Sequence, residues 1–286
     1  MSNAENAALP LSTRCAELTR IEALAVHESV RTRAGVVVHW RRFGQGAGTP
    51  LVLLHGGHGN WSHWVRNVEA LSAQRSVWVA DMPGYGRSDS LPEGADVDLL
   101  IATLADSINL LFGADASIDL AGFSFGGLVA ATLSTRRPVS HLMLLGSAGH
   151  GGGRRPYPPL RAWRRAPDAE QRRADFDFNL HAFMLHQRTP DDLALCAYED
   201  ACLQTRFRSR RPDLAGRLVE ALEQATANKL LLWGDRDVTF DHPVAYSDRL
   251  HQAGIAHRFE LIANAGHWVQ FEQADVVNRL LNEWIS

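Results

Sequence analysis

Seven short runs of β-forming residues, separated by segments with helical spacing, constrain the fold of this 286-residue chain more than any other feature. From the third run onward the runs are almost continuously apolar, which is typical of strands covered on both faces in a parallel sheet. In chain order they are GVVVHW (35–40), PLVLLH (50–55), SVWVAD (76–81), SIDLAG (117–122), HLMLLG (141–146), KLLLWG (229–234) and HRFELI (257–262).

Helical patterns lie between the runs, most clearly over 97–112, 126–136 and 269–285. Strand followed by helix, repeated, predicts an α/β fold with a doubly wound, mostly parallel sheet, and residues 21–44 predict an antiparallel hairpin at its first edge. Strand patterns are missing from 149 to about 226, where the apolar spacing favours several short helices. We therefore expect three parts: a flexible N-terminal leader (1–20), one core domain (21–148 and 227–286) and a helical insertion (149–226).

Composition and charge limit the partners that we expect. A hydrophobic content of 45%, a charged content of 21% and a net charge of -3 are ordinary for a soluble globular protein and do not favour nucleic acid or membrane partners. The three cysteines form neither an even set nor a metal-ligand spacing, and no apolar stretch reaches the ~20 residues that span a bilayer. These features predict a cytoplasmic protein that acts on a small molecule without cofactor or metal, and they leave a homo-oligomer open.

The stretch GFSFG (122–126) is the first candidate for chemistry, because it places Ser124 between a buried strand and a helix. A GxSxG pattern in that context predicts a sharp turn that holds the serine exposed at the carboxyl end of the strand. A serine hydroxyl is a weak nucleophile near neutral pH and needs a histidine base, which in turn needs an orienting carboxylate. The alternative is a small residue in a purely structural turn.

Among 13 histidines, His267 is the best candidate base, because it lies in a loop after the last strand and just before the last helix. The acid should follow an intervening strand, and the segment KLLLWGDRDVTFDHP offers three aspartates, Asp235, Asp237 and Asp241. The pattern alone does not choose among them.

The glycine-rich turn LLHGGHGNW (53–61) follows a strand, and its backbone N–H groups are candidates to face Ser124. Together with the N–H of Phe125 they predict a site that stabilises a developing oxyanion. The turn lacks the GKS or GKT ending of a phosphate-binding loop, and no cysteine or carboxylate spacing supports a metal site at His55, His58 and His63.

Five pieces of the chain, in this order, resemble the α/β-hydrolase superfamily: HGG (55–57), DMPGYGRSD (81–89), GFSFGG (122–127), WGDRD (233–237) and GHW (266–268). The resemblance implies that Asp237 is the acid, that Gly57 and Phe125 supply the oxyanion N–H groups, with Gly56 and His58 as neighbours if the loop is shifted, and that the insertion is a cap over the site. Within the superfamily, the chain is similar to hydrolases of meta-cleavage products, which break carbon-carbon bonds in ring-opened aromatic catabolites of the 2-hydroxy-6-oxo-dienoate type.

That similarity implies two substrate contacts, Trp268 after the histidine and a cap arginine, for which Arg206 or Arg208 is the candidate. Further apolar candidates for the pocket are Trp61, Trp64, Phe125, Phe183 and Met184. The chain departs from those hydrolases at Phe123, where they usually have asparagine, and the departure favours a carboxylesterase or lactonase as the alternative. A ligand receptor on the same fold, an acyltransferase and a haloperoxidase-like enzyme are further alternatives.

Overall fold

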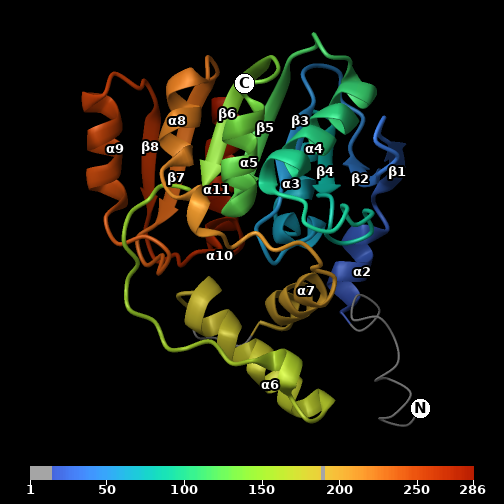
Figure 1. Ribbon diagram of the computed structural model, residues 1–286, viewed down its shortest axis with the longest axis vertical. Coiled ribbons are helices and arrows are strands. Elements are labelled where there is room, and N and C mark those ends of the chain that lie inside the picture. Colours follow the sequence, from blue (N-terminus) through green and yellow to red (C-terminus); the bar gives the residue numbers. More distant parts are fainter. Residues whose placement is uncertain (1–14, 188–190) are drawn as a thin grey trace.

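A computed structural model describes residues 15–187 and 191–286. In this part of the chain, eight strands form one sheet in the order β1-β2-β4-β3-β5-β6-β7-β8 (Figure 1). The strands from β4 to β8 pair in parallel, whereas β2 is antiparallel to both β1 and β4. The predicted α/β fold with a mostly parallel sheet and the predicted hairpin at its first edge are therefore confirmed. The strands are β1 (Val26–Arg31), β2 (Val37–Phe43), β3 (Leu51–Leu54), β4 (Val77–Asp81), β5 (Ile118–Phe123), β6 (Val139–Leu145), β7 (Asn228–Gly234) and β8 (Arg258–Ile262).

Helices cover both faces of the sheet, which explains why its central strands are apolar on both sides. Two buried clusters result, one on each face. The first face carries α4 (Val97–Phe112), α5 (Phe125–Leu133), α8 (Arg217–Gln224) and α9 (Pro243–Gln252). The second carries α3 (Val68–Ser72), α10 (Val269–Glu272) and α11 (Ala274–Trp284).

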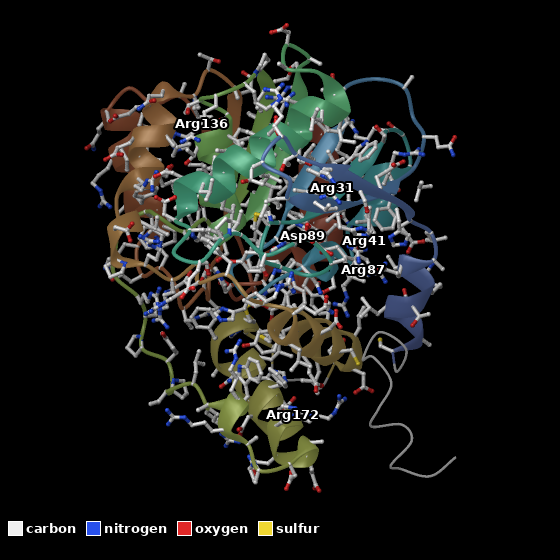
Figure 2. All side chains as sticks on the ribbon, turned by 45° about the vertical axis from the view of Figure 1, so that its right-hand side comes forward. Arg31, Arg41, Arg87, Asp89, Arg136 and Arg172 are labelled. Atoms are coloured by element: carbon white, nitrogen blue, oxygen red, sulfur yellow. The ribbon has the colours of Figure 1, made fainter. Side chains whose placement is uncertain are left out.

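The residues after β6 form a helical cap below the carboxyl ends of the strands (Figure 1). The side-chain view in Figure 2 shows Arg172 on cap helix α6, at the opposite end of the molecule from Arg136. The cap contains η3 (Trp163–Arg165), α6 (Ala169–Asn179), η4 (Leu180–Met184), α7 (Asp192–Leu203) and η5 (Pro212–Leu214).

The predicted boundary of this insertion, 149–226, reaches too far. Helix α8 lies beside α5 over the sheet, and its Leu218 and Leu222 are buried in the cluster of that face (Figure 1). Its apolar stripe is indistinguishable from that of a cap helix in the sequence, because periodicity reports which face is buried but not the partner that buries it.

The predicted leader, 1–20, is wrong at its C-terminal end. Helix α2 (Ala16–Glu22) buries Leu18 and Ile21 in the same cluster as residues of α7, and the Thr19 hydroxyl donates to the Cys15 carbonyl at 3.1 Å. Residues 1–14 lie outside the described residues. In the part of the chain that the structure covers, no helix is both long and apolar enough to span a membrane.

Candidate active site

Ser124 lies at the sharp turn between β5 and α5 with φ 54° and ψ -117°, a conformation that non-glycine residues rarely adopt. The turn brings the strand and the helix so close that flanking side chains have no room. A Cβ on Gly122 would lie 2.2 Å from the Gly126 carbonyl oxygen, and a Cβ on Gly126 would lie 2.3 Å from the His55 carbonyl oxygen. The glycines of the GxSxG pattern are therefore required by the backbone, and the serine is held at the carboxyl edge of the sheet.

His267 and Asp237 complete a hydrogen-bonded chain with Ser124. His267 Nε2 is 2.9 Å from Ser124 Oγ, and His267 Nδ1 is 2.9 Å from Asp237 Oδ2. The three side chains come from the loops after β5, β7 and β8, which end at the same edge of the sheet because these strands are parallel. The arrangement matches a nucleophile, a base and an orienting acid in geometry.

Asp237 is the one aspartate of the three candidates that reaches His267. Asp235 instead accepts the N–H of Ala265, and Asp241 lies beside Gly153 at the start of the cap. Burial favours a higher pKa for Asp237, but the His267 imidazole and two hydrogen bonds from Thr239 outweigh it and lower the pKa. The carboxylate is thus kept ionised where it faces the imidazole.

The turn after β3 runs beside the serine and brings Gly57 next to Phe125. A Cβ on Gly57 would lie 3.5 Å from the Phe125 Cβ. The N–H of Gly56 donates to His63 Nδ1 at 3.1 Å, so this neighbouring candidate is already engaged. Gly57 and Phe125 remain the predicted oxyanion donors.

The two buried histidines beside this turn, His55 and His63, are held neutral. Burial lowers the pKa of His55 to about 4 and the pKa of His63 well below its ordinary range. His55 accepts the Met82 N–H at Nε2, so its Nδ1 carries the proton and donates to the Gly56 carbonyl at 2.8 Å. These hydrogen bonds give His55 and His63 a structural role.

A cavity of about 240 Å³ opens over Ser124 and His267 between the sheet edge and the cap. Among the described residues, the lining includes three arginines, Arg154, Arg161 and Arg210, and no aspartate or glutamate. The Tyr157 hydroxyl accepts hydrogen bonds from Arg154, at 3.4 Å, and from Arg210. Neither of these two arginines forms an ion pair within residues 15–187 and 191–286. The mouth of the cavity is therefore suited to an anionic group.

Aromatic and apolar side chains line the rest of the cavity. Phe125, Phe183 and Met184 are there as expected from the sequence. Trp61 and Trp64 are instead buried in the core beneath the sheet edge. Residues that the sequence did not single out as pocket residues complete the wall, and they are Phe123, Leu160, Trp163, Asn179, Tyr198, Cys202 and Ser209.

Trp268 does not line the cavity, which corrects its predicted role as a substrate contact. Its ring is fully buried, its Nε1 donates to the His63 carbonyl at 2.9 Å, and its backbone N–H donates to the Met184 carbonyl at 2.8 Å. It supports the loop that carries His267 and does not face the substrate space.

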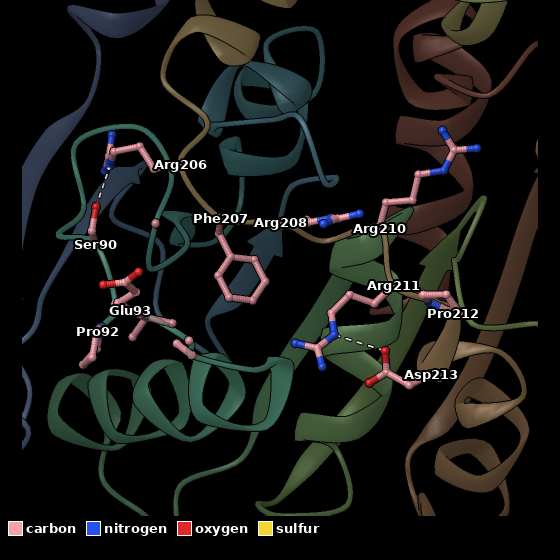
Figure 3. A pocket seen from close by; sticks show the side chains of 14 residues that line it. Ser90, Pro92, Glu93, Arg206, Phe207, Arg208, Arg210, Arg211, Pro212 and Asp213 are labelled. Atoms are coloured by element: carbon pink, nitrogen blue, oxygen red, sulfur yellow. Dashed lines mark hydrogen bonds and ion pairs between the residues drawn. The ribbon is translucent and has the colours of Figure 1, made fainter.

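Arg206 also lies elsewhere. Its guanidinium hydrogen-bonds Ser90 Oγ at 2.9 Å, the Gly86 carbonyl at 3.1 Å and the Ser88 carbonyl (Figure 3). It lines, with Arg208, an outer groove of about 650 Å³ that shares only Arg210 with the lining of the cavity over Ser124. Arg206 fastens the cap to the loop after β4, and the structure does not bring it to Ser124.

Glu272 is a further residue that the sequence did not reveal. Its carboxylate accepts the N–H groups of Gly266, His186 and Gln187, at 2.6, 2.8 and 2.8 Å. It therefore joins the His267 loop to the cap. No motif predicts this, because the contact with His186 spans 86 residues.

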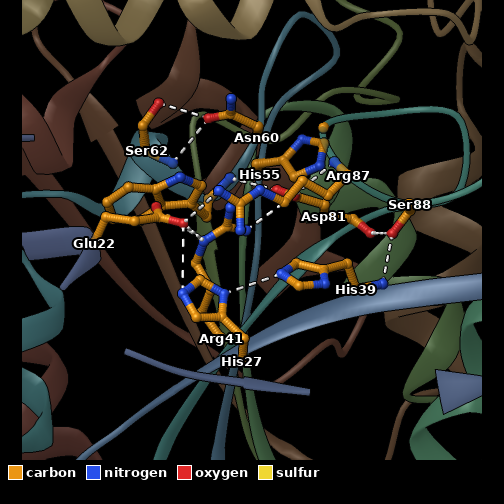
Figure 4. Close-up of polar contacts among 12 residues, drawn as sticks. Glu22, His27, His39, Arg41, His55, Asn60, Ser62, Asp81, Arg87 and Ser88 are labelled. Carbon is orange, nitrogen blue, oxygen red and sulfur yellow. Dashed lines mark hydrogen bonds and ion pairs between the residues drawn. The ribbon is translucent and has the colours of Figure 1, made fainter. Parts of the chain in front are cut away.

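The segment DMPGYGRSD forms a loop anchored by Asp81, which is buried at the end of β4 (Figure 4). Asp81 accepts the N–H groups of Trp61 and Arg87, both at 3.0 Å, and pairs with Arg41 at 2.9 Å. Arg41 also binds Glu22 of α2 at 2.9 Å. Burial opposes ionisation of Asp81, but Arg41 lowers its pKa overall. The network fixes the glycine-rich turn against the neighbouring strand.

An eight-stranded, mostly parallel sheet with a serine at a strand-to-helix turn defines the class of α/β-fold hydrolases. The chain belongs to the alpha/beta hydrolase family, whose model matches residues 51–280. It is an enzyme of that family.

Two similar proteins have names of different kinds, one a hydrolase and the other an acetyltransferase component. The chain is 30% identical over 258 residues to the 2-hydroxy-6-oxo-2,4-heptadienoate hydrolase of Pseudomonas putida, a match that covers 84% of this chain and 90% of the relative. It is 31% identical over 257 residues to the dihydrolipoyllysine-residue acetyltransferase component of the acetoin cleaving system of Pseudomonas putida, covering 86% of this chain but only 65% of that protein. A solved variant of the meta-cleavage product hydrolase CumD aligns with a TM-score of 0.70 at 25% identity, over 91% of this chain and 98% of that one.

Proposed function

We propose that the protein is a hydrolase in which Ser124 is the nucleophile, His267 the base and Asp237 the orienting acid. The observation that carries this proposal is the 2.9 Å approach of His267 Nε2 to Ser124 Oγ, at a strained turn that opens into a cavity. In the first step His267 takes the proton of Ser124 as Oγ adds to a carbonyl carbon. The N–H groups of Gly57 and Phe125 stabilise the negative oxygen, and water activated by His267 then releases the acyl group.

We infer that the substrate is a ring-opened aromatic catabolite of the 2-hydroxy-6-oxo-dienoate type, cleaved at a carbon-carbon bond. The aromatic lining suits a flat conjugated chain, and the arginines at the mouth suit its carboxylate. Cleavage requires that a proton reaches the leaving carbon, that Ser124 or water adds to the ketone carbon, and that the bond between these carbons breaks. The name of the 30% identical relative supports this substrate class.

A carboxylesterase or lactonase is the second candidate, and Phe123 is the observation that favours it. The ring of Phe123 lines the cavity and lies 4.9 Å from the His267 ring, where a polar side chain would assist proton transfer to carbon. An ester needs no such transfer, because its leaving oxygen is protonated by His267 directly.

The test is to incubate the protein with a dienoate ketone, an activated ester and a lactone, and to identify the cleaved bond by mass spectrometry. We expect the dienoate ketone to be split into a carboxylic acid and a shorter dienoate. Ser124→Ala should abolish turnover, and a fluorophosphonate should block the wild type. Equal, background activity of wild type and Ser124→Ala on all three substrates would contradict the hydrolase proposal and favour a ligand receptor. Added alcohol or thiol acceptors would reveal acyl transfer in the product spectrum.

A further inference from the structure

We propose that Ser209, on the segment that leads from the cap back to the core, is a positioning residue for the oxyanion site. Its hydroxyl donates to the Gly57 carbonyl at 3.2 Å and lines the cavity over Ser124. The inference rests on the proposed function and adds to it a residue that acts through Gly57.

The Gly57 backbone is held at the carbonyls on both of its sides. His55 binds the Gly56 carbonyl, which shares a planar peptide group with the Gly57 N–H. Ser209 binds the Gly57 carbonyl, which shares a peptide group with the His58 N–H. Glycine has the freest backbone of all residues, so anchoring both neighbouring peptide groups restricts the backbone rotation that would otherwise turn its N–H. Ser209 supplies the second anchor.

The contact is close enough to be specific for glycine. A Cβ on Gly57 would lie 2.2 Å from Ser209 Oγ, so any other residue at position 57 would displace this hydroxyl. Two residues earlier, the ring of Phe207 stacks on Phe125 with centroids 6.2 Å apart. The segment 207–209 therefore contacts both residues that are expected to donate to the oxyanion.

Arg206 holds this segment in place. The backbone N–H groups of Arg206 and Phe207 donate to the Gly84 carbonyl at 2.9 and 3.1 Å, and the Arg206 guanidinium binds the same loop. The cap is thus seated on the loop after β4, with Ser209 placed over Gly57. It follows that the oxyanion site is fully formed only when this segment of the cap is seated.

The test measures how fast a fluorophosphonate labels Ser124, because this reaction does not depend on the identity of the natural substrate. Ser124 Oγ bonds to phosphorus, fluoride leaves, the proton passes to His267, and the phosphoryl oxygen occupies the oxyanion site. Ser209→Ala should slow labelling about 10-fold, less than the ~100-fold loss typical when an oxyanion donor is removed outright. Ser209→Cys, which keeps the size but donates weakly, should fall between Ser209→Ala and the wild type, and Ser209→Thr should restore the rate.

Thr205→Ala is the matched control, since it removes a hydroxyl of the same segment that donates to the Ala201 carbonyl at 2.8 Å, outside the cavity. It should label at the wild-type rate. A second readout separates positioning from a purely structural role: Ser209→Ala should weaken binding of a trifluoromethyl ketone, which forms a tetrahedral adduct, about as much as it slows labelling, and leave binding of the product acid unchanged.

If a fluorophosphonate labelled Ser209→Ala at the wild-type rate, the inference would be overturned and the proposed function would stand. The same holds for an equal loss in Thr205→Ala, or for equal weakening of both ligands. A wild-type protein that is not labelled at all would overturn the proposed function, and the inference with it.

Discussion

The two walls of the cavity, one from the sheet and one from the cap, differ in charge and in the burial of their side chains. The wall from the sheet contains neutral, deeply buried groups: His55, next to the lining, and His63 are kept uncharged by burial, and Phe123 is fully enclosed. The wall from the cap presents the exposed arginines Arg154 and Arg210. From this difference we infer a division of roles, in which the neutral wall positions the proposed reacting groups and the charged wall binds an anionic part of the ligand.

Removing the acid of the sheet wall should have the largest effect. Asp237→Asn keeps the shape of the side chain but cannot hold the His267 imidazolium, so we expect kcat to fall about 10⁴-fold, as in other enzymes with this triad. Steady-state kinetics on the best substrate of the panel would measure it. Asp235→Asn is the matched control and should retain activity, and a similar loss in both variants would refute the assignment of the acid.

The buried ion pair behind the sheet wall should dominate stability. Arg41→Met leaves Asp81 buried without its cation and should lower the free energy of unfolding by about 3 to 5 kcal/mol. Arg20→Met breaks exposed ion pairs with Glu17 and Glu69 and should leave the free energy of unfolding unchanged within error. Urea unfolding of the two variants provides the comparison, and equal effects would remove the distinction between them.

Acid should lower the stability of the folded protein through protonation of His55 in the sheet wall. Its pKa is about 4 in the folded protein and 6.5 when exposed, so the unfolded chain binds a proton first, and stability is lost as the pH falls from about 6.5 to 4. For this one group the loss is about 3 kcal/mol at the lower end of that window. His55→Gln lacks the titration and should show a shallower decline in unfolding free energy. Parallel curves for the wild type and the variant would show that His55 is protonated equally in both states.

On the cap wall, two arginines should separate recognition from fastening. Arg210→Met should raise KM about 10-fold for a substrate with a carboxylate and leave KM for a neutral ester unchanged, because it removes one charge-assisted contact. Arg206→Met should leave KM unchanged and lower stability by about 1 to 3 kcal/mol through its lost hydrogen bonds. Kinetics and thermal unfolding of both variants test this, and a KM effect in Arg206→Met alone would reverse the assignment.

The same contrast explains what the sequence could predict. Ser124, Asp237 and His267 each follow a strand of the parallel part of the sheet, so identifying the strands also placed these side chains at one edge of the sheet. The cap has no comparable strand pattern from which the positions of its side chains could be predicted. Residues 204–210 alternate arginine with smaller or aromatic residues, and which arginine faces the cavity depends on where α7 ends and on the path of the chain beyond it.

Local conformation also limits what the sequence predicts. The π-helical turn over Leu180–Met184 has no periodicity that sequence patterns detect, although Phe183 and Met184, which it brings to the cavity, are among the predicted pocket residues. Trp268 follows the proposed base His267 directly in the chain, yet its ring turns into the core toward the His63 carbonyl. Adjacency in sequence to a catalytic residue does not determine the direction of a side chain.

The fit between Ser209 and Gly57 sets a condition for exchanging caps between members of this family. A transplanted segment would have to present a small hydroxyl side chain, serine or threonine, at position 209, since Ser209 Oγ lies only 2.2 Å from where a Cβ on Gly57 would be. We therefore expect residues 57 and 209 to vary together within the family. Chimeras that combine mismatched residues at these positions should fold with a gap between cap and core beside Ser124.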